Sequence, residues 1–183
     1  MALAFAGNGT ITGLSVGGLP DGTVDADTLA SGVGGKVLQC LSQVYSTVGS
    51  TSNTFANDNS KPQISEGVEI MTQAITPSNS SNILIIQGVV NIGTANTGNT
   101  IMVALFQDST ANCLSAWSHM PHENNACLSL SYFYRMTAGT TSSTTFKIRY
   151  AGQGGTTHVN QLSGGNTYDS SYNSTMCVSE ISA

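Results

Sequence analysis

The chain has 183 residues, of which 39% are hydrophobic and only 8% are charged, and its formal net charge is −5. An average globular protein carries about 25% charged residues. Disordered chains combine low hydrophobicity with high net charge, so this composition indicates a folded chain with an uncharged polar surface. The few basic residues form no run, which argues against nucleic acid as a partner, because phosphate contacts need clustered Lys or Arg.

Residues 11–36 form a segment that is both apolar and rich in glycine. Its apolar residues recur where a solvated linker would not need them, whereas its seven glycines oppose a regular strand or helix. We therefore predict an N-terminal arm over residues 1–35, ordered by another surface, ahead of a domain over residues 36–183. The residues that we expect to bind the partner are Ile11, Leu14, Val16, Leu19, Val24 and Leu29.

The opening decapeptide, MALAFAGNGT, lacks the basic region and the long apolar core of a signal peptide. No apolar run approaches the ~20 residues that span a bilayer. We therefore expect synthesis in the cytoplasm and no membrane partner.

The four cysteines match no zinc-binding spacing and are too sparse for a disulfide scaffold. Three of them lie in apolar, strand-like runs, and we expect Cys40, Cys127 and Cys177 to be buried thiols.

After the arm, apolar residues alternate with a two-residue period in short runs. The clearest run is 144–150, where Phe146, Ile148 and Tyr150 share one face and Lys147 and Arg149 the other. Segment 82–92 is apolar on both faces, which is typical of a central strand. The expected strands are 37–45, 66–75 (with Val68, Ile70 and Thr72 on one face), 82–92, 100–106, 113–117, 128–136, 144–150, 156–162 and 175–181.

About eight strands and almost no helical periodicity predict an all-β fold, a jelly-roll-like antiparallel β-sandwich with an extended N-terminal arm. We expect residues 46–63 to form a loop at one end of the sandwich. A single helical turn is expected at residues 25–31, capped by Asp25 or Asp27.

Groups that could carry chemistry are few. His119, His122 and Glu123 lie in HMPHE, but a helical zinc site needs His at i and i+4, and proline breaks a helix here. The aspartates of DGTVDAD do not follow the spacing of a calcium loop, and turn formation explains them better. His158 has no neighbouring carboxylate, and no GxSxG motif supplies a nucleophile. We expect no catalytic residue, no cofactor and no metal.

Tyrosines offer a different kind of site. Tyr132, Tyr134 and Tyr150 occupy inward strand positions, so we expect core packing for them. Tyr168 and Tyr172 fall in the polar segment GGNTYDSSYNS, where contact with protein or sugar stays open.

Three stretches resemble a known group of proteins. ITGLSVGGLPDGTVDADTLASG resembles the N-terminal segment of virion surface proteins of tailed bacteriophages, and AITPSNSSNILIIQGVVNIG is similar to their "TITPSS-x-SSKILI" strand-turn-strand, with Asn82 where Lys is common. The last segment, from FKIRY to STMCVSEI, resembles their final strands. The resemblance implies a jelly-roll-like virion structural protein, often trimeric, with no catalytic residues.

These observations together predict a non-enzymatic capsid cement or decoration protein of the virion, made in the host cytoplasm. Its expected partners are the major capsid protein or another virion protein through the arm, and sister copies in a homotrimer. The alternative is a small tail-fibre or head-fibre receptor-binding protein whose loops contact host glycan. A polysaccharide-degrading enzyme is a third class, but no paired carboxylates stand out for it.

Overall fold

A computed structural model describes residues 4–5, 11–12, 36–162, 165–166 and 171–183, with side chains for 36–162 and 171–183. The chain divides into two units, Met1–Gly35 and Lys36–Ala183. In the first unit, strands β1 (Ala4–Phe5) and β2 (Ile11–Thr12) pair antiparallel. Ile11 therefore lies in a short strand. The other expected arm residues (Leu14, Val16, Leu19, Val24 and Leu29), the aspartates Asp21, Asp25 and Asp27, and the expected turn at 25–31 lie outside the described residues.

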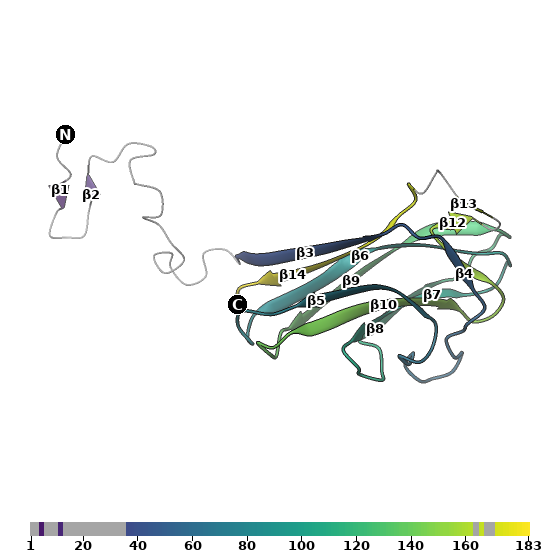
Figure 1. Cartoon of the computed structure of the whole chain (residues 1–183), viewed down its shortest axis with the longest axis horizontal. Coiled ribbons are helices and arrows are strands. Elements are labelled where there is room, and N and C mark those ends of the chain that lie inside the picture. Colours follow the sequence, from purple (N-terminus) through teal and green to yellow (C-terminus); the bar gives the residue numbers. More distant parts are fainter. Residues whose placement is uncertain (1–3, 6–10, 13–35, 163–164, 167–170) are drawn as a thin grey trace. The chain divides into compact units, whose positions relative to one another are not determined.

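The second unit, residues 36–183, is a sandwich of two antiparallel sheets (Figure 1). The four-stranded sheet has the order β5 (Val68–Ile75), β10 (Thr144–Gly152), β7 (Ile101–Gln107), β8 (Ser115–His119). The six-stranded sheet consists of β3 (Val37–Tyr45), β14 (Ser174–Ile181), β6 (Ile83–Thr94), β11 (Thr157–Val159), β4 (Gly49–Thr51) and β9 (Ala126–Thr137). A further short pair joins β12 (Gln161–Leu162) to β13 (Gly165–Asn166).

The predicted all-β, jelly-roll-like sandwich is confirmed. Strand β6 is central as expected, because it pairs with β14 and β11 on one side and with β9 on the other. Among the described residues there is no helix, and hence none of the length and hydrophobicity that crossing a bilayer demands.

The core between the sheets follows the two-residue period. On β10, Phe146 and Ile148 are fully buried and Tyr150 nearly so, whereas Lys147 and Arg149 point outward, as predicted. From the facing sheet, Leu84 and Ile86 of β6 complete this core, together with Val90, Met176 and Val178.

Strand β5 departs from the simple alternation. Ile148 pairs with Met71 but Arg149 pairs with Glu69, so Ile70 is an extra residue in the ladder. A β-bulge of this kind reverses the alternation beyond it. Ile70 and Met71 are consequently both buried, and Thr72, which we expected on the same face as Ile70, is exposed.

Residues 46–63 are more than the end loop that the sequence predicts. They contain β4, and Phe55 is 1% exposed in a second apolar cluster with Ala104, Phe106, Cys113 and Ala151. These partners lie on the side of the four-stranded sheet that faces away from the main core. Segment 46–63 packs on this sheet because Phe55 buries the apolar residues on the sheet's outward side. This contact joins residues distant in sequence, so local composition does not predict it.

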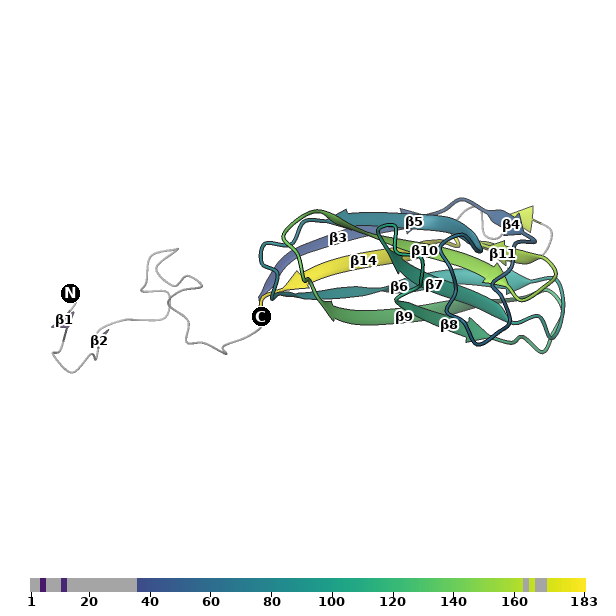
Figure 2. The ribbon, with the colours of Figure 1, turned by 90° about the horizontal axis from the view of Figure 1, so that it is seen from below.

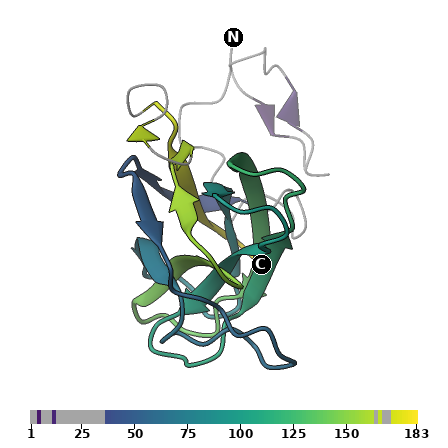
Figure 3. The same cartoon turned by 90° about the vertical axis from the view of Figure 1, so that its right-hand side faces the viewer.

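The two long sides of the sandwich differ. Figure 2 shows β3 beside β5 along one side and β9 beside β8 along the other, and Figure 3 shows the body from its end. On the β3–β5 side, the Gln43 side-chain oxygen accepts a hydrogen bond from the Thr72 amide (3.0 Å), and Gln39 Nε2 donates to the Thr76 carbonyl (2.8 Å). On the β8–β9 side, Trp117 packs against Tyr132 with ring centroids 5.6 Å apart.

Candidate interaction surfaces

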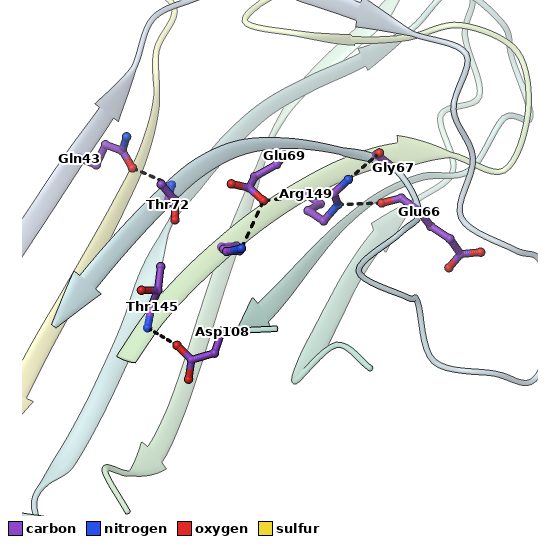
Figure 4. Close-up of polar contacts among 9 residues, drawn as sticks. Gln43, Glu66, Gly67, Glu69, Thr72, Asp108, Thr145 and Arg149 are labelled. Carbon is purple, nitrogen blue, oxygen red and sulfur yellow. Dashed lines mark hydrogen bonds and ion pairs between the residues drawn. The ribbon is translucent and has the colours of Figure 1, made fainter. Parts of the chain in front are cut away.

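The outward side of the four-stranded sheet is polar and internally paired. Figure 4 shows Arg149 of β10 donating to the Glu66 and Gly67 carbonyls (2.8 and 3.1 Å) and pairing with Glu69 (3.3 Å). Lys147 lies 4.0 Å from the same carboxylate. With Phe55 covering its apolar positions, this sheet presents little that would drive association.

The outward side of the six-stranded sheet, here called the outer face, is different. Across β3, β14, β6 and β9, Arg135 is the single charged residue at the outward positions of these described strands. Val44 is 63% exposed and Phe133 is 56% exposed. Its apolar residues are Leu38, Val44, Ile83, Ile85, Val89, Phe133 and Ile181. Leu38, Val44 and Phe133 are exposed and the other four are partly exposed, and large exposed apolar patches mark interaction sites.

A hollow of about 620 Å³ lies in the outer face, between Val44 of β3 and Ser131 of β9. Gly88 lies at its floor, where the Tyr132 hydroxyl donates to the Thr175 carbonyl at 2.9 Å. A Cβ at Gly88 would meet that carbonyl and would lie 2.7 Å from the Tyr132 hydroxyl oxygen, so only glycine fits. Burial raises the pKa of Tyr132, so this hydroxyl keeps its proton and its donor role at neutral pH.

A second apolar surface, here called the open side, lies along the edges of β8 and β9. Its residues pack on the core yet stay partly exposed, because none of the described strands of residues 36–183 covers this side of the sandwich. They are Leu114, Trp117, Leu128, Leu130, Tyr134 and Met136. Adjacent residues of β9 serve both surfaces: Phe133 points to the outer face and Tyr134 to the open side.

The point where the chain enters the body is fixed by a buried carboxylate. Glu180 is 0% exposed and accepts hydrogen bonds from Asn82 Nδ2 (2.6 Å), Gln39 Nε2 (2.5 Å) and both the amide and hydroxyl of Ser78 (2.8 Å each). Burial alone would raise the pKa of Glu180, but these hydrogen bonds outweigh it and lower the pKa to about 2. Lys36, just before β3, is hydrogen-bonded to Ser182, just after β14, so these contacts and the carboxylate network together hold the start of β3 to the end of β14.

Glu180 was not among the residues expected to matter, although the sequence carries a signal for it. In the run STMCVSEI, the glutamate has the same parity as Met176 and Val178, and the alternation therefore places it inward. A lone acidic residue at an inward position requires several donors, and the nearby PSNSSN turn supplies two of them.

The other predicted positions are scattered. His119, His122 and Glu123 are exposed, and within the described part of the chain no three His, Cys, Asp or Glu side chains gather as a metal site would require. His158 is buried on β11, and burial lowers its pKa. Tyr172 is half-buried, with its hydroxyl 3.3 Å from the Cys127 sulfur, and Tyr168 lies outside the described residues.

The expectation of three buried thiols is wrong for Cys40, which is exposed, while Cys127 and Cys177 are half-buried; the buried thiol is Cys113. On β3 the inward positions belong to Gln39, Leu41, Gln43 and Tyr45, and this leaves Cys40 on the outer face. The run VLQCLSQVY has apolar residues on both faces, so its alternation does not reveal which face is inward.

No protein-family model matches the chain, and no curated protein does. Similar solved structures include the C-terminal domain of EclA, a sugar-binding protein (17% identity, 63% of this chain and 75% of that chain, TM-score 0.33). Eiger TNF from S. frugiperda is 10% identical over 79% of this chain and 92% of that chain, with a TM-score of 0.44. The infectious bursal disease virus VP2 subviral particle is 12% identical over 79% of this chain and 37% of that chain, with a TM-score of 0.36. At these values the likeness does not extend beyond the all-β class, and it carries no argument about function.

Proposed function

We propose that the chain is a non-enzymatic virion structural protein, a capsid cement or decoration protein. Its arm, residues 1–35, binds the major capsid protein, and its body assembles into a homotrimer. The observation that carries the proposal is the presence of two weakly charged apolar surfaces, the outer face and the open side, on a body whose other long side and other sheet face are closed.

Two different apolar surfaces suit a cyclic trimer. A ring uses a heterologous interface, in which one patch of each copy contacts a different patch of the next. The open side offers Trp117 and Tyr134, of the aromatic type that is enriched at interface cores, and the outer face offers a hollow to receive them. Because Arg135 is the one charge on the outward positions of its four strands, covering the outer face desolvates few charged groups.

The arm supplies the attachment to the shell. Its apolar residues bury area at roughly 25 cal/mol per Å², and its glycines let the backbone follow a surface. Three arms on one trimer raise the effective concentration of each contact, so weak single arms suffice. The resemblance of this segment to phage virion proteins supports the capsid shell as the surface.

The proposal is tested by binding to purified capsids that lack the protein. We expect the full chain to saturate the heads, and a chain without residues 1–35 to remain a folded trimer that does not bind. If the truncated chain still decorates capsids at full occupancy, the role of the arm is wrong. Circular dichroism and sedimentation of the truncated chain serve as controls for fold and assembly.

The alternative, a fibre protein that reads host glycan, is favoured by one feature. An open polar hollow of about 430 Å³ is lined by Asn96, Asn99 and Gln153 together with Gly154 and Gly155. Planar amides can bind sugar hydroxyls, but no aromatic platform lies among its described lining residues. Few copies per particle, and blocked adsorption by the purified protein that is lost in Asn99→Ala, would favour this function over cement.

A further inference from the structure

We propose that Cys40 and Cys177 are a reactive thiol pair that closes to an intramolecular disulfide, tying the edge strand β3 to β14. The two sulfur atoms lie 3.2 Å apart on the outer face, where Cys40 is exposed and Cys177 is half-buried. A disulfide requires an approach of only about 1 Å more.

The strand register explains how the two sulfurs meet. Ser179 lies directly opposite Cys40, and Ser42 directly opposite Cys177, so the cysteines are diagonal neighbours across the ladder. Diagonal neighbours on one sheet face lie roughly 7–8 Å apart, so these short side chains meet only because their sulfur atoms point toward each other, 3.2 Å apart. Among the described strands β3 pairs with β14 alone and is an edge strand; on its other side it is held by the side chains of Gln39 and Gln43, which can follow the small shift that the bond needs.

The surroundings give the two thiols different roles. The Ser179 hydroxyl lies 3.4 Å from the Cys40 sulfur, and hydrogen bonds from Ser179 and Cys177 lower the pKa of Cys40. Burial raises the pKa of Cys177. Cys40 is therefore the attacking thiolate and Cys177 the resolving thiol. Cys113 and Cys127 have a pKa raised by burial and no thiol partner among the described contacts, so they serve as internal references.

The reaction is an exchange with a small disulfide such as oxidised glutathione. The Cys40 thiolate attacks one glutathione sulfur, forms a mixed disulfide and releases one glutathione thiolate. Cys177 then loses its proton to solvent and attacks the Cys40 sulfur, and the second glutathione leaves. The two protein thiols are oxidised by two electrons in total, and one oxidised glutathione is reduced to two thiols.

The cross-link has a structural consequence. It joins residues 137 positions apart in sequence and fixes the strand that directly follows residues 1–35. Closing so long a loop restricts the unfolded chain, so the oxidised protein is expected to melt roughly 5–10 °C higher. The bond itself does not depend on the proposed function, but its accessibility does, because a trimer that covers the outer face also shields the pair.

The test uses the full chain, reduced, freed of reductant and then treated with oxidised glutathione at mildly alkaline pH. Remaining thiols are alkylated, and intact and peptide masses are measured. We expect two of the four thiols to disappear, a mass lower by two hydrogens before alkylation, and one cross-linked peptide pair holding Cys40 and Cys177. Cys177→Ser should stop at the mixed disulfide on Cys40, Cys40→Ser should react far more slowly, and Cys127→Ser should behave like the wild type.

A stable mixed disulfide in the wild type, a link to Cys113 or Cys127, or disulfide-linked dimers on a non-reducing gel would each overturn the proposal. Phe133→Glu, which disfavours covering of the outer face, separates this inference from the trimer. If this variant closes the bond faster than the wild type, both ideas are supported. If the variant and the wild type form the disulfide at the same rate, the thiol pair is supported and the covering of the outer face is refuted. If the variant retains all four thiols, the thiol pair is refuted whatever its oligomeric state.

Discussion

Replacement of Glu180 by glutamine tests whether the buried carboxylate holds the entry of the chain into the body. The hydrogen bonds from Asn82, Gln39 and Ser78 lower the pKa of Glu180 from 4.5 to about 2 despite its burial. A lowering of this size corresponds to about 3 kcal/mol of folding stability. Glutamine keeps the shape, but it removes the charge and turns one acceptor into a donor that faces other donors. We therefore expect Glu180→Gln to lower the free energy of unfolding by about 2–3 kcal/mol at neutral pH.

The direction of the pKa shift determines how stability should change with pH. Because the pKa is lower in the folded chain than in the unfolded chain, the stabilisation is fully present above pH 4.5 and is lost as the pH falls toward 2. Urea unfolding followed by tryptophan fluorescence, at several pH values across this window, measures it. The wild type should weaken steeply on acidification, and Glu180→Gln should show a flatter profile.

A matched control comes from the surface. Glu69→Gln removes an exposed carboxylate paired with Lys147 and Arg149, and such a pair contributes at most about 1 kcal/mol. The reasoning is refuted if Glu180→Gln unfolds at the same urea concentration as the wild type at neutral pH, or if it retains the wild-type slope with pH.

Three further substitutions test other parts of the structure. Gly88→Ala should lower the free energy of unfolding by about 1–3 kcal/mol, because the new Cβ meets the Thr175 carbonyl and the Tyr132 hydroxyl. An unchanged midpoint of urea unfolding would contradict this. Phe55→Ala should cost about 3–5 kcal/mol by emptying the second cluster, whereas a loss below 1 kcal/mol would mean that it covers little. Phe133→Glu should leave circular dichroism unchanged but shift sedimentation from trimer to monomer; a persisting trimer would contradict the proposed interface.

The sequence predicted most of the strands because the sandwich follows the two-residue period. On β10 the pattern TTFKIRY separated the buried Phe146 and Ile148 from the outward Lys147 and Arg149. On β9 the same period placed Tyr132 inward and Phe133 outward. On β10 one face is apolar and the other polar, and on β9 the outward face is polar apart from Phe133 and Cys127, so the sequence of each strand is enough to predict which face is inward.

The failures share a physical cause, which is that they depend on contacts distant in sequence. The bulge at Ile70 becomes visible only through its pairing with β10, and Phe55 finds its place only against Ala104 and Phe106. For β6, apolar residues on both faces correctly indicated a central strand. They did not indicate that Ile83 and Ile85 would be left on an uncovered face.

The interaction surfaces were hidden from the sequence for the same reason. The outer face is assembled from alternate residues of four strands that are far apart along the chain. The open side exists because no described strand lies beyond the edges of β8 and β9. The arm remains a prediction, and it rests on local features alone, because apolar residues and glycines occur together in one continuous segment.

The most direct test of the central claim is cryo-electron microscopy of intact virions at a resolution that separates β-sheets. We predict density for this sandwich on the capsid shell in many symmetry-related copies, grouped in threes, with the outer face of one copy against the open side of the next and residues 1–35 on the shell. Finding the sandwich in a few copies at a tail or a single vertex, or as isolated subunits with both surfaces facing solvent, would contradict the account.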